Sequence, residues 1–129
     1  MANVIARQFS RHALADISVS TAATTTITLP PNTLVIGGLY SVVTGATGTT
    51  PTLTMVDNSG VPVTYLSAVA IGSVADGTLA AAGVGLFYPA GATLSFTTGG
   101  TTPAGGRILV DVEYLVVGTQ HENYGPSVA

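Results

Sequence analysis

Short segments rich in threonine, valine and isoleucine, each ended by glycine or proline, recur along this chain. β-Branched side chains favour extended backbone, and clusters of glycine and proline end strands in turns. No long segment repeats apolar residues at intervals of three and four, which is the period of an amphipathic helix. The sequence therefore predicts an all-β protein.

The segment 107–117 has the clearest strand pattern, because apolar residues occupy every second position along it. Side chains of a strand point alternately to its two faces, so these residues share one face. They are Ile108, Val110, Val112, Tyr114 and Val116. The other face mixes Leu109 and Leu115 with Asp111 and Glu113. We expect that face to be partly wet, or its acids to be paired with an arginine.

The segment 33–44 is apolar on both faces. This pattern is typical of a central strand that is covered on two sides, and Gly37-Gly38 permits a bend or a bulge. We expect this segment to lie in the core.

The segment 51–57 alternates, with Leu53 and Met55 facing inward. The residues Asn58-Ser59-Gly60 are turn formers, so a return strand is expected at 61–67. Further strands are predicted at 24–29, 84–88 and 93–97, and loops at 45–50 and 99–106. The small residues of 68–82 fit either a short helix or a surface loop.

About seven or eight short strands joined by glycine and proline turns predict a β-sandwich, jelly-roll-like in type. The length of 129 residues fits a single domain with a real core. We place the sandwich at residues 14–118. It follows an extended N-terminal arm, residues 1–13, and precedes a C-terminal tail, residues 119–129.

Charged residues make up only 7% of the chain, and lysine and cysteine are absent. Ordinary soluble proteins have about 25% charged residues, so this surface is either rich in threonine, serine and glycine or covered by neighbouring subunits. A net charge of −3 with three arginines predicts no nucleic-acid binding. No apolar stretch reaches the ~18–20 residues of a membrane helix, and the N-terminus lacks a signal pattern. We expect no membrane association, and synthesis in the cytoplasm.

Patterns for catalysis or metal binding are weak. His12 and His121 lie in terminal segments, and neither is near a nucleophile motif. Asp111 and Glu113 share a strand face, as a glycosidase pair would, but a solvated or salt-bridged face explains them better. His121 and Glu122 alone supply only two metal ligands, and two ligands do not complete a metal site. We expect a non-enzymatic protein without cofactor or metal, since an enzyme would need a pocket that gathers Asp111, Glu113 and a histidine.

The two terminal segments contain the candidate interaction residues. Phe9 and Tyr124 lie where no local core is evident, so either can anchor in the pocket of a partner. The other candidates are their polar neighbours Arg7, Gln8, Arg11, His12, His121 and Glu122. Most strand aromatics are expected in the core. In an alternative function, Tyr65 or Tyr88 would line a carbohydrate-binding surface.

From Thr24 onwards, the order of strands and turns resembles that of small virion structural proteins of tailed bacteriophages. The matching pieces are residues 29–38, 42–44, 52–57 with Tyr65-Leu66, 88–94 and 106–115. The resemblance implies a capsid decoration, or cement, protein on the outside of an icosahedral head. Its implied partners are the major capsid protein and further copies of itself, as a dimer or trimer. Phage tail and fibre components have similar compositions, so a tail, fibre or receptor-binding module is the alternative.

Overall fold

The computed structural model describes residues 10–19, 25–80 and 84–117. Within these ranges the regular structure consists of nine strands, and no helix is long and apolar enough to cross a membrane. In chain order the strands are β1 (Arg11–Ser18), β2 (Thr25–Leu29), β3 (Thr33–Thr44), β4 (Thr47–Val56), β5 (Thr64–Ala70), β6 (Ala75–Thr78), β7 (Phe87–Tyr88), β8 (Ala92–Ala104) and β9 (Arg107–Val116).

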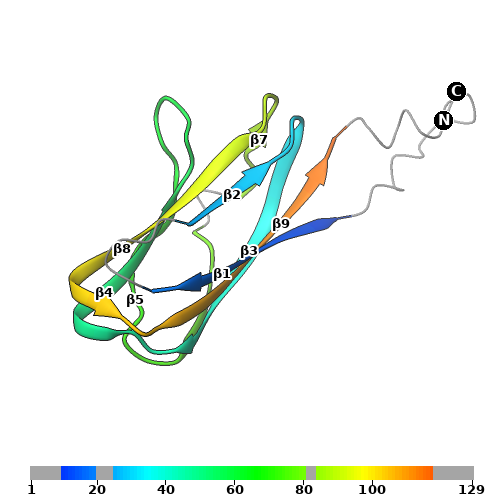
Figure 1. Ribbon diagram of the computed structural model, residues 1–129. Coiled ribbons are helices and arrows are strands. Elements are labelled where there is room, and N and C mark those ends of the chain that lie inside the picture. Colours follow the sequence, from blue (N-terminus) through cyan, green and yellow to red (C-terminus); the bar gives the residue numbers. More distant parts are fainter. Residues whose placement is uncertain (1–9, 20–24, 81–83, 118–129) are drawn as a thin grey trace, which may run out of the picture.

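Two antiparallel sheets face each other in the described part of the chain (Figure 1). Sheet A has the strand order β1-β9-β3-β6, and β7 also pairs with β3. Sheet B has the order β2-β8-β4-β5. The expected all-β sandwich is confirmed.

The strand pairing is that of a jelly roll. If the short β7 is set aside, the first strand pairs with the last, the second with the next to last, and so on inward. The chain is therefore one long antiparallel hairpin that is folded over so that its strand pairs fall alternately in sheet A and sheet B. The pairs are β1 with β9, β2 with β8, β3 with β6 and β4 with β5.

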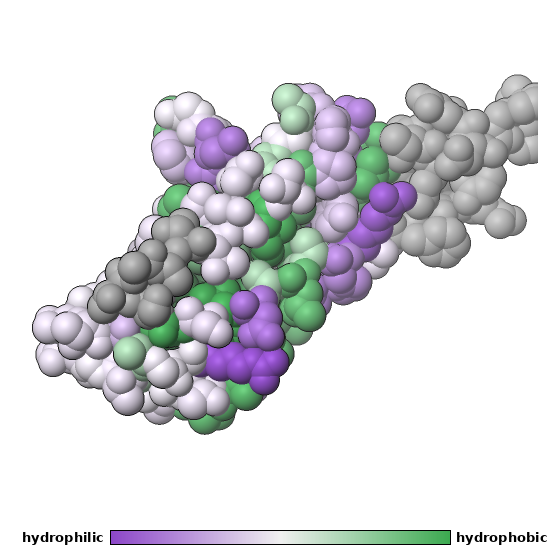
Figure 2. All heavy atoms as spheres, in the orientation of Figure 1, coloured by the Kyte–Doolittle hydropathy of each residue, from purple (hydrophilic) through white to green (hydrophobic). Residues whose placement is uncertain are grey.

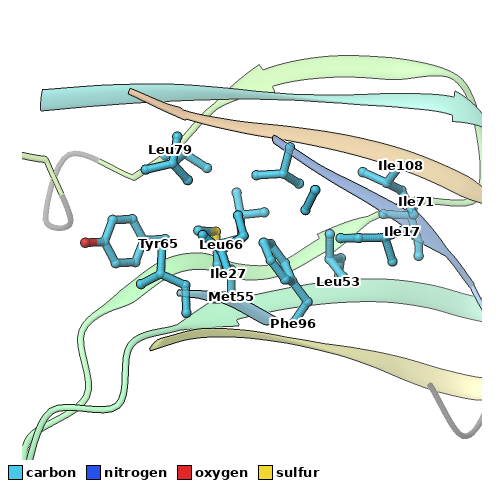
Figure 3. Close-up of a cluster of buried hydrophobic side chains, with 14 of the residues drawn as sticks. Ile17, Ile27, Leu53, Met55, Tyr65, Leu66, Ile71, Leu79, Phe96 and Ile108 are labelled. Carbon is cyan, nitrogen blue, oxygen red and sulfur yellow. The ribbon is translucent and has the colours of Figure 1, made fainter. Parts of the chain in front are cut away.

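The core lies between the two sheets and is formed by every second residue of the long strands. Leu53, Met55 and Phe96 enter it from sheet B, and Ile108 enters it from sheet A (Figure 3). All four are buried, as are Val110 and Val112 of β9. The inward residues predicted in 51–57 and 107–117 are thus confirmed.

The expectation that residues 33–44 are covered on both sides is wrong. Val35 and Val42 are fully buried, but Leu39 is 58% exposed. Each sheet of a two-layer sandwich is covered on one face only, so the second apolar face of β3 lies on the outside. The register of β3 against β9 shifts between Val35 and Gly37, which confirms the expected bulge.

Three segments expected to be irregular contain strand residues. The predicted loop at 45–50 is mostly the start of β4, which begins at Thr47. Within the described part of this chain's small-residue segment, residues 68–80, the chain is neither a helix nor only a loop, because β5 runs to Ala70 and β6 follows. The predicted loop at 99–106 is mostly the end of β8, which reaches Ala104 because it pairs with β4 as far as Thr47. Backbone pairing across the sheet here outweighs the low strand propensity of Gly99-Gly100.

Strand β1 has no counterpart in the sequence-based prediction. It begins at Arg11, so residues 11–13 of the expected arm belong to sheet A and pair with β9. Ala15 and Ile17 of β1 are buried in the core. Residues 1–9 and 118–129 lie outside the described residues.

Candidate interaction surface

The outer face of sheet A places a histidine beside an acid. Residues His12 and Leu14 of β1 lie opposite Glu113 and Asp111 of β9. Nδ1 of His12 is 3.0 Å from both carboxylate oxygens of Asp111, and both side chains are partly exposed. The outer face of β9 is therefore partly wet, as expected. The residue paired with Asp111 is a histidine and not the expected arginine, because the neighbouring strand β1 places His12 beside it.

An ion pair lies further along the same two strands. Nε and a terminal nitrogen of Arg107 donate to the two carboxylate oxygens of Asp16, both at 3.0 Å. The hydrogen bonds from Arg107 lower the pKa of Asp16, which stays ionised at neutral pH. Asp76, on the edge strand β6, accepts a 2.6 Å hydrogen bond from the hydroxyl of Ser41.

An open groove of about 370 Å³ lies between these polar groups. Leu14, Leu39 and Leu109 come from three adjacent strands and supply its apolar lining. Leu14 and Leu39 flank Asp111 in one cross-strand row. Their exposures of 67% and 58% are high for leucine in a folded domain.

The lining of the groove also includes acids. Asp76 and Asp111 line it, together with Ser41, Tyr40 and Gly77. Gly77 is required there, because a Cβ at this position would overlap the ring of Tyr40. Carboxylates beside exposed leucines form a surface that can bind an apolar side chain next to a cation.

The two outer faces differ in charge. The four strands of sheet B contain no arginine, histidine or acidic residue, whereas β1, β6 and β9 of sheet A contain seven such residues between them. In sheet B, Thr26, Thr97 and other threonines alternate with the core residues. Figure 2 shows hydrophilic spheres gathered along β1 and β9, and paler spheres around β4 and β8. The described charges are therefore concentrated on one sheet.

The structure gives little support to catalysis on this face. His12, Asp111 and Glu113 share the outer face of sheet A, but of these three only Asp111 lines the groove. Among the described residues, no group of three or more histidines and acids is arranged to hold a metal ion. The face offers hydrogen bonds, ion pairs and apolar contact, which are the elements of an interface.

The predicted candidate residues divide into two sets. Arg11 and His12 belong to β1, and His12 contributes to the outer face of sheet A. The others lie outside the described residues, and they are Arg7, Gln8, Phe9, His121, Glu122 and Tyr124. Sequence reasoning missed the leucines of the groove. Their only sequence signal is that they are large apolar residues at outward positions of strands.

The alternative placing of Tyr65 on a sugar-binding surface is wrong. Tyr65 is fully buried, and its hydroxyl is 2.6 Å from that of Tyr88. Tyr88 is half-buried, and its own hydroxyl donates to Asp57. Both tyrosine hydroxyls therefore form hydrogen bonds within the protein.

Comparisons with known proteins find likeness in structure only. No protein-family model matches the chain, and no curated protein matches it in sequence. The fold is similar to a chain in the cyanophage Pam1 capsid asymmetric unit, with a TM-score of 0.55 and 20% identity over 85% of both chains. It is similar to a chain in the capsid of Ralstonia phage GP4, with a TM-score of 0.55 and 17% identity over 92% of both chains. At these identities the likeness shows a shared jelly-roll fold.

Proposed function

We propose that this chain is a non-enzymatic structural protein of a tailed-bacteriophage virion. It decorates the outer surface of the icosahedral capsid and stabilises it through contacts with the major capsid protein and with other copies of itself. The terminal segments, residues 7–12 and 121–124, take part in these contacts.

The observation that carries this proposal is the extent of the structural likeness. Two chains from two phage capsid structures match this chain over 85% or more of their own length and of this one. The likeness therefore extends over most of the chain and is not limited to one common motif. The resemblance of the strand and turn segments to small virion proteins is an independent observation on the sequence.

The surface chemistry is consistent with an assembly subunit. Exposed leucines gathered on one face are typical of a protein interface. We assign the outer face of sheet A to neighbouring proteins. A decoration protein is present in many copies, and repetition turns a modest contact into a firm attachment.

Fractionation of virions tests the proposal and separates it from a tail or fibre role. Particles of a phage that encodes this chain are separated into heads and tails, and the chain is quantified in each fraction by mass spectrometry. We expect it with the heads, at a fixed ratio to the major capsid protein. Recovery with the tails would favour the fibre alternative, and absence from particles would contradict both.

A further inference from the structure

The groove on sheet A has no occupant among the described residues, and its chemistry specifies what fits. Three leucines line it together with two carboxylates, those of Asp76 and Asp111, and Nδ1 of His12 lies 3.0 Å from the Asp111 carboxylate. Its volume is near the lower end of the range for small-molecule pockets, about 300–1,000 Å³, so it admits a few side chains and not a domain. A suitable occupant is a short segment that carries aliphatic residues and a cation, without an acid.

One terminal segment of this chain has that chemistry. Residues 1–9 contain Val4, Ile5 and Phe9, with Arg7 as the single charged side chain. Residues 118–129 contain Glu122 and neither lysine nor arginine, so their charge does not complement the acidic lining of the groove. Electrostatic complementarity therefore selects the N-terminal segment.

We propose that residues 1–9 of one copy bind in the sheet A groove of a second copy. Val4 or Ile5 packs against Leu14, Leu39 and Leu109, and Arg7 pairs with the carboxylates of the lining. This interaction goes beyond the proposed virion role and does not depend on it, because it requires only copies of this chain.

Reach and direction favour a second copy. Nine extended residues span at most about 30 Å, which is enough to cross to an adjacent subunit. Leu14 lies within β1, only four residues after Ser10. To fill the groove of its own copy, the segment would have to reverse immediately before β1. Residues 6–10 contain neither glycine nor proline to form such a tight turn.

Sedimentation equilibrium tests the proposal, with four variants of the full chain. We expect the full chain to self-associate and a chain without residues 1–9 to be monomeric. Leu39→Ser and Arg7→Glu should each raise the dissociation constant about tenfold or more, as loss of a central contact does. Val61→Ser is the matched control, because Val61 is 86% exposed on the loop before β5 and should leave the constant unchanged.

A mixing experiment tests whether the contact is between copies. The chain without residues 1–9 keeps an intact groove, and Leu39→Ser keeps an intact segment. Each variant alone should be largely monomeric. Their mixture should form a one-to-one complex, in which the segment of the Leu39→Ser chain occupies the groove of the truncated chain. Circular dichroism checks that both variants are folded, which is expected because Leu39 is exposed.

A synthetic peptide of residues 1–9 locates the contact on the acceptor chain. Added to the chain without residues 1–9, it should shift the NMR amide signals of β1, β3 and β9 around Leu14, Leu39 and Asp111. Shifts confined to sheet B, a monomeric full chain, or equal association with and without residues 1–9 would each overturn the proposal. None of these outcomes bears on whether the chain is found in virions.

Discussion

The hydroxyl of Tyr88 donates a 2.7 Å hydrogen bond to Oδ2 of Asp57, a carboxylate that is only 3% exposed. Oδ1 of the same carboxylate accepts from the backbone N–H of Val63 at 2.9 Å and from the hydroxyl of Ser59 at 2.8 Å. Because Tyr88 donates to Asp57, the hydroxyl of Tyr65 donates to Tyr88 at 2.6 Å. This network joins the loop between β4 and β5 of sheet B to β7 of sheet A.

Removal of the Asp57 charge should destabilise the fold. Asp57→Asn replaces charge-assisted hydrogen bonds with weaker ones. It also places an amide N–H₂ group where hydrogen-bond donors already converge. We therefore expect the free energy of unfolding to fall by about 1–3 kcal/mol. Urea unfolding followed by circular dichroism measures it. Asp76→Asn is the control at protein concentrations too low for self-association, because Asp76 is exposed and its hydrogen bond among the described residues is the one from Ser41. Its effect should stay within about 0.5 kcal/mol. Equal effects of the two substitutions would contradict the role of the network.

The same carboxylate predicts how stability depends on pH. Burial opposes its ionisation, but the hydrogen bonds from Val63, Tyr88 and Ser59 outweigh burial and lower the pKa of Asp57. A carboxyl whose pKa is lower in the folded state than in the unfolded state stabilises the fold above the unfolded value of about 3.9. That contribution is lost as the pH falls through the lower, folded value. The free energy of unfolding should decline below about pH 4, and it should decline less steeply in Asp57→Asn.

Two glycines should respond in opposite ways to alanine. A Cβ at Gly38 would lie 2.7 Å from the backbone oxygen of Asp111 and overlap the side chain of Leu79, so Gly38→Ala should cost about 1–3 kcal/mol. Gly60 lies in the loop before β5 with open space around its Cβ position. Gly60→Ala should be neutral or should stabilise by up to about 1 kcal/mol, because alanine restricts the unfolded chain. Thermal unfolding of both variants tests the contrast.

Truncation from the N-terminus should show a sharp boundary. Removal of residues 1–9 leaves β1 intact, so the unfolding midpoint in urea should equal that of the full chain at protein concentrations too low for self-association. Removal of residues 1–18 deletes β1 with its buried Ala15 and Ile17 and exposes the edge of β9. That chain should be insoluble or only partly folded. A folded, soluble protein without β1 would show that the strand is not part of the cooperative unit.

Much of the fold could be predicted from the sequence, because strand alternation reports which residues are buried. Leu53, Met55 and the inward residues of β9 follow from that pattern, and the turn at 58–60 follows from its residue types. Strand β1 could not be found in the same way. Its inward residues, Ala13, Ala15 and Ile17, include two alanines of low strand propensity, and its outward residues include Leu14.

The groove was not predictable from the sequence, because it depends on which strands are neighbours. Alternation places Leu109 and Asp111 on one face of a strand, but it does not show that β1 and β3 flank that strand. The pairing of Asp111 with His12, and not with an arginine, was not predictable for the same reason. Residues 99 apart in the chain meet only because the first strand of the jelly roll pairs with the last.

Binding to capsids tests the central claim most directly. Purified chain is titrated onto phage heads that lack it, the heads are pelleted, and the bound copies per head are counted. We expect saturable binding at a fixed number of copies per capsid, and slower heat disruption of the decorated heads. Binding that does not saturate, or none to heads while tails or host cells retain the chain, would contradict the assignment to the capsid surface.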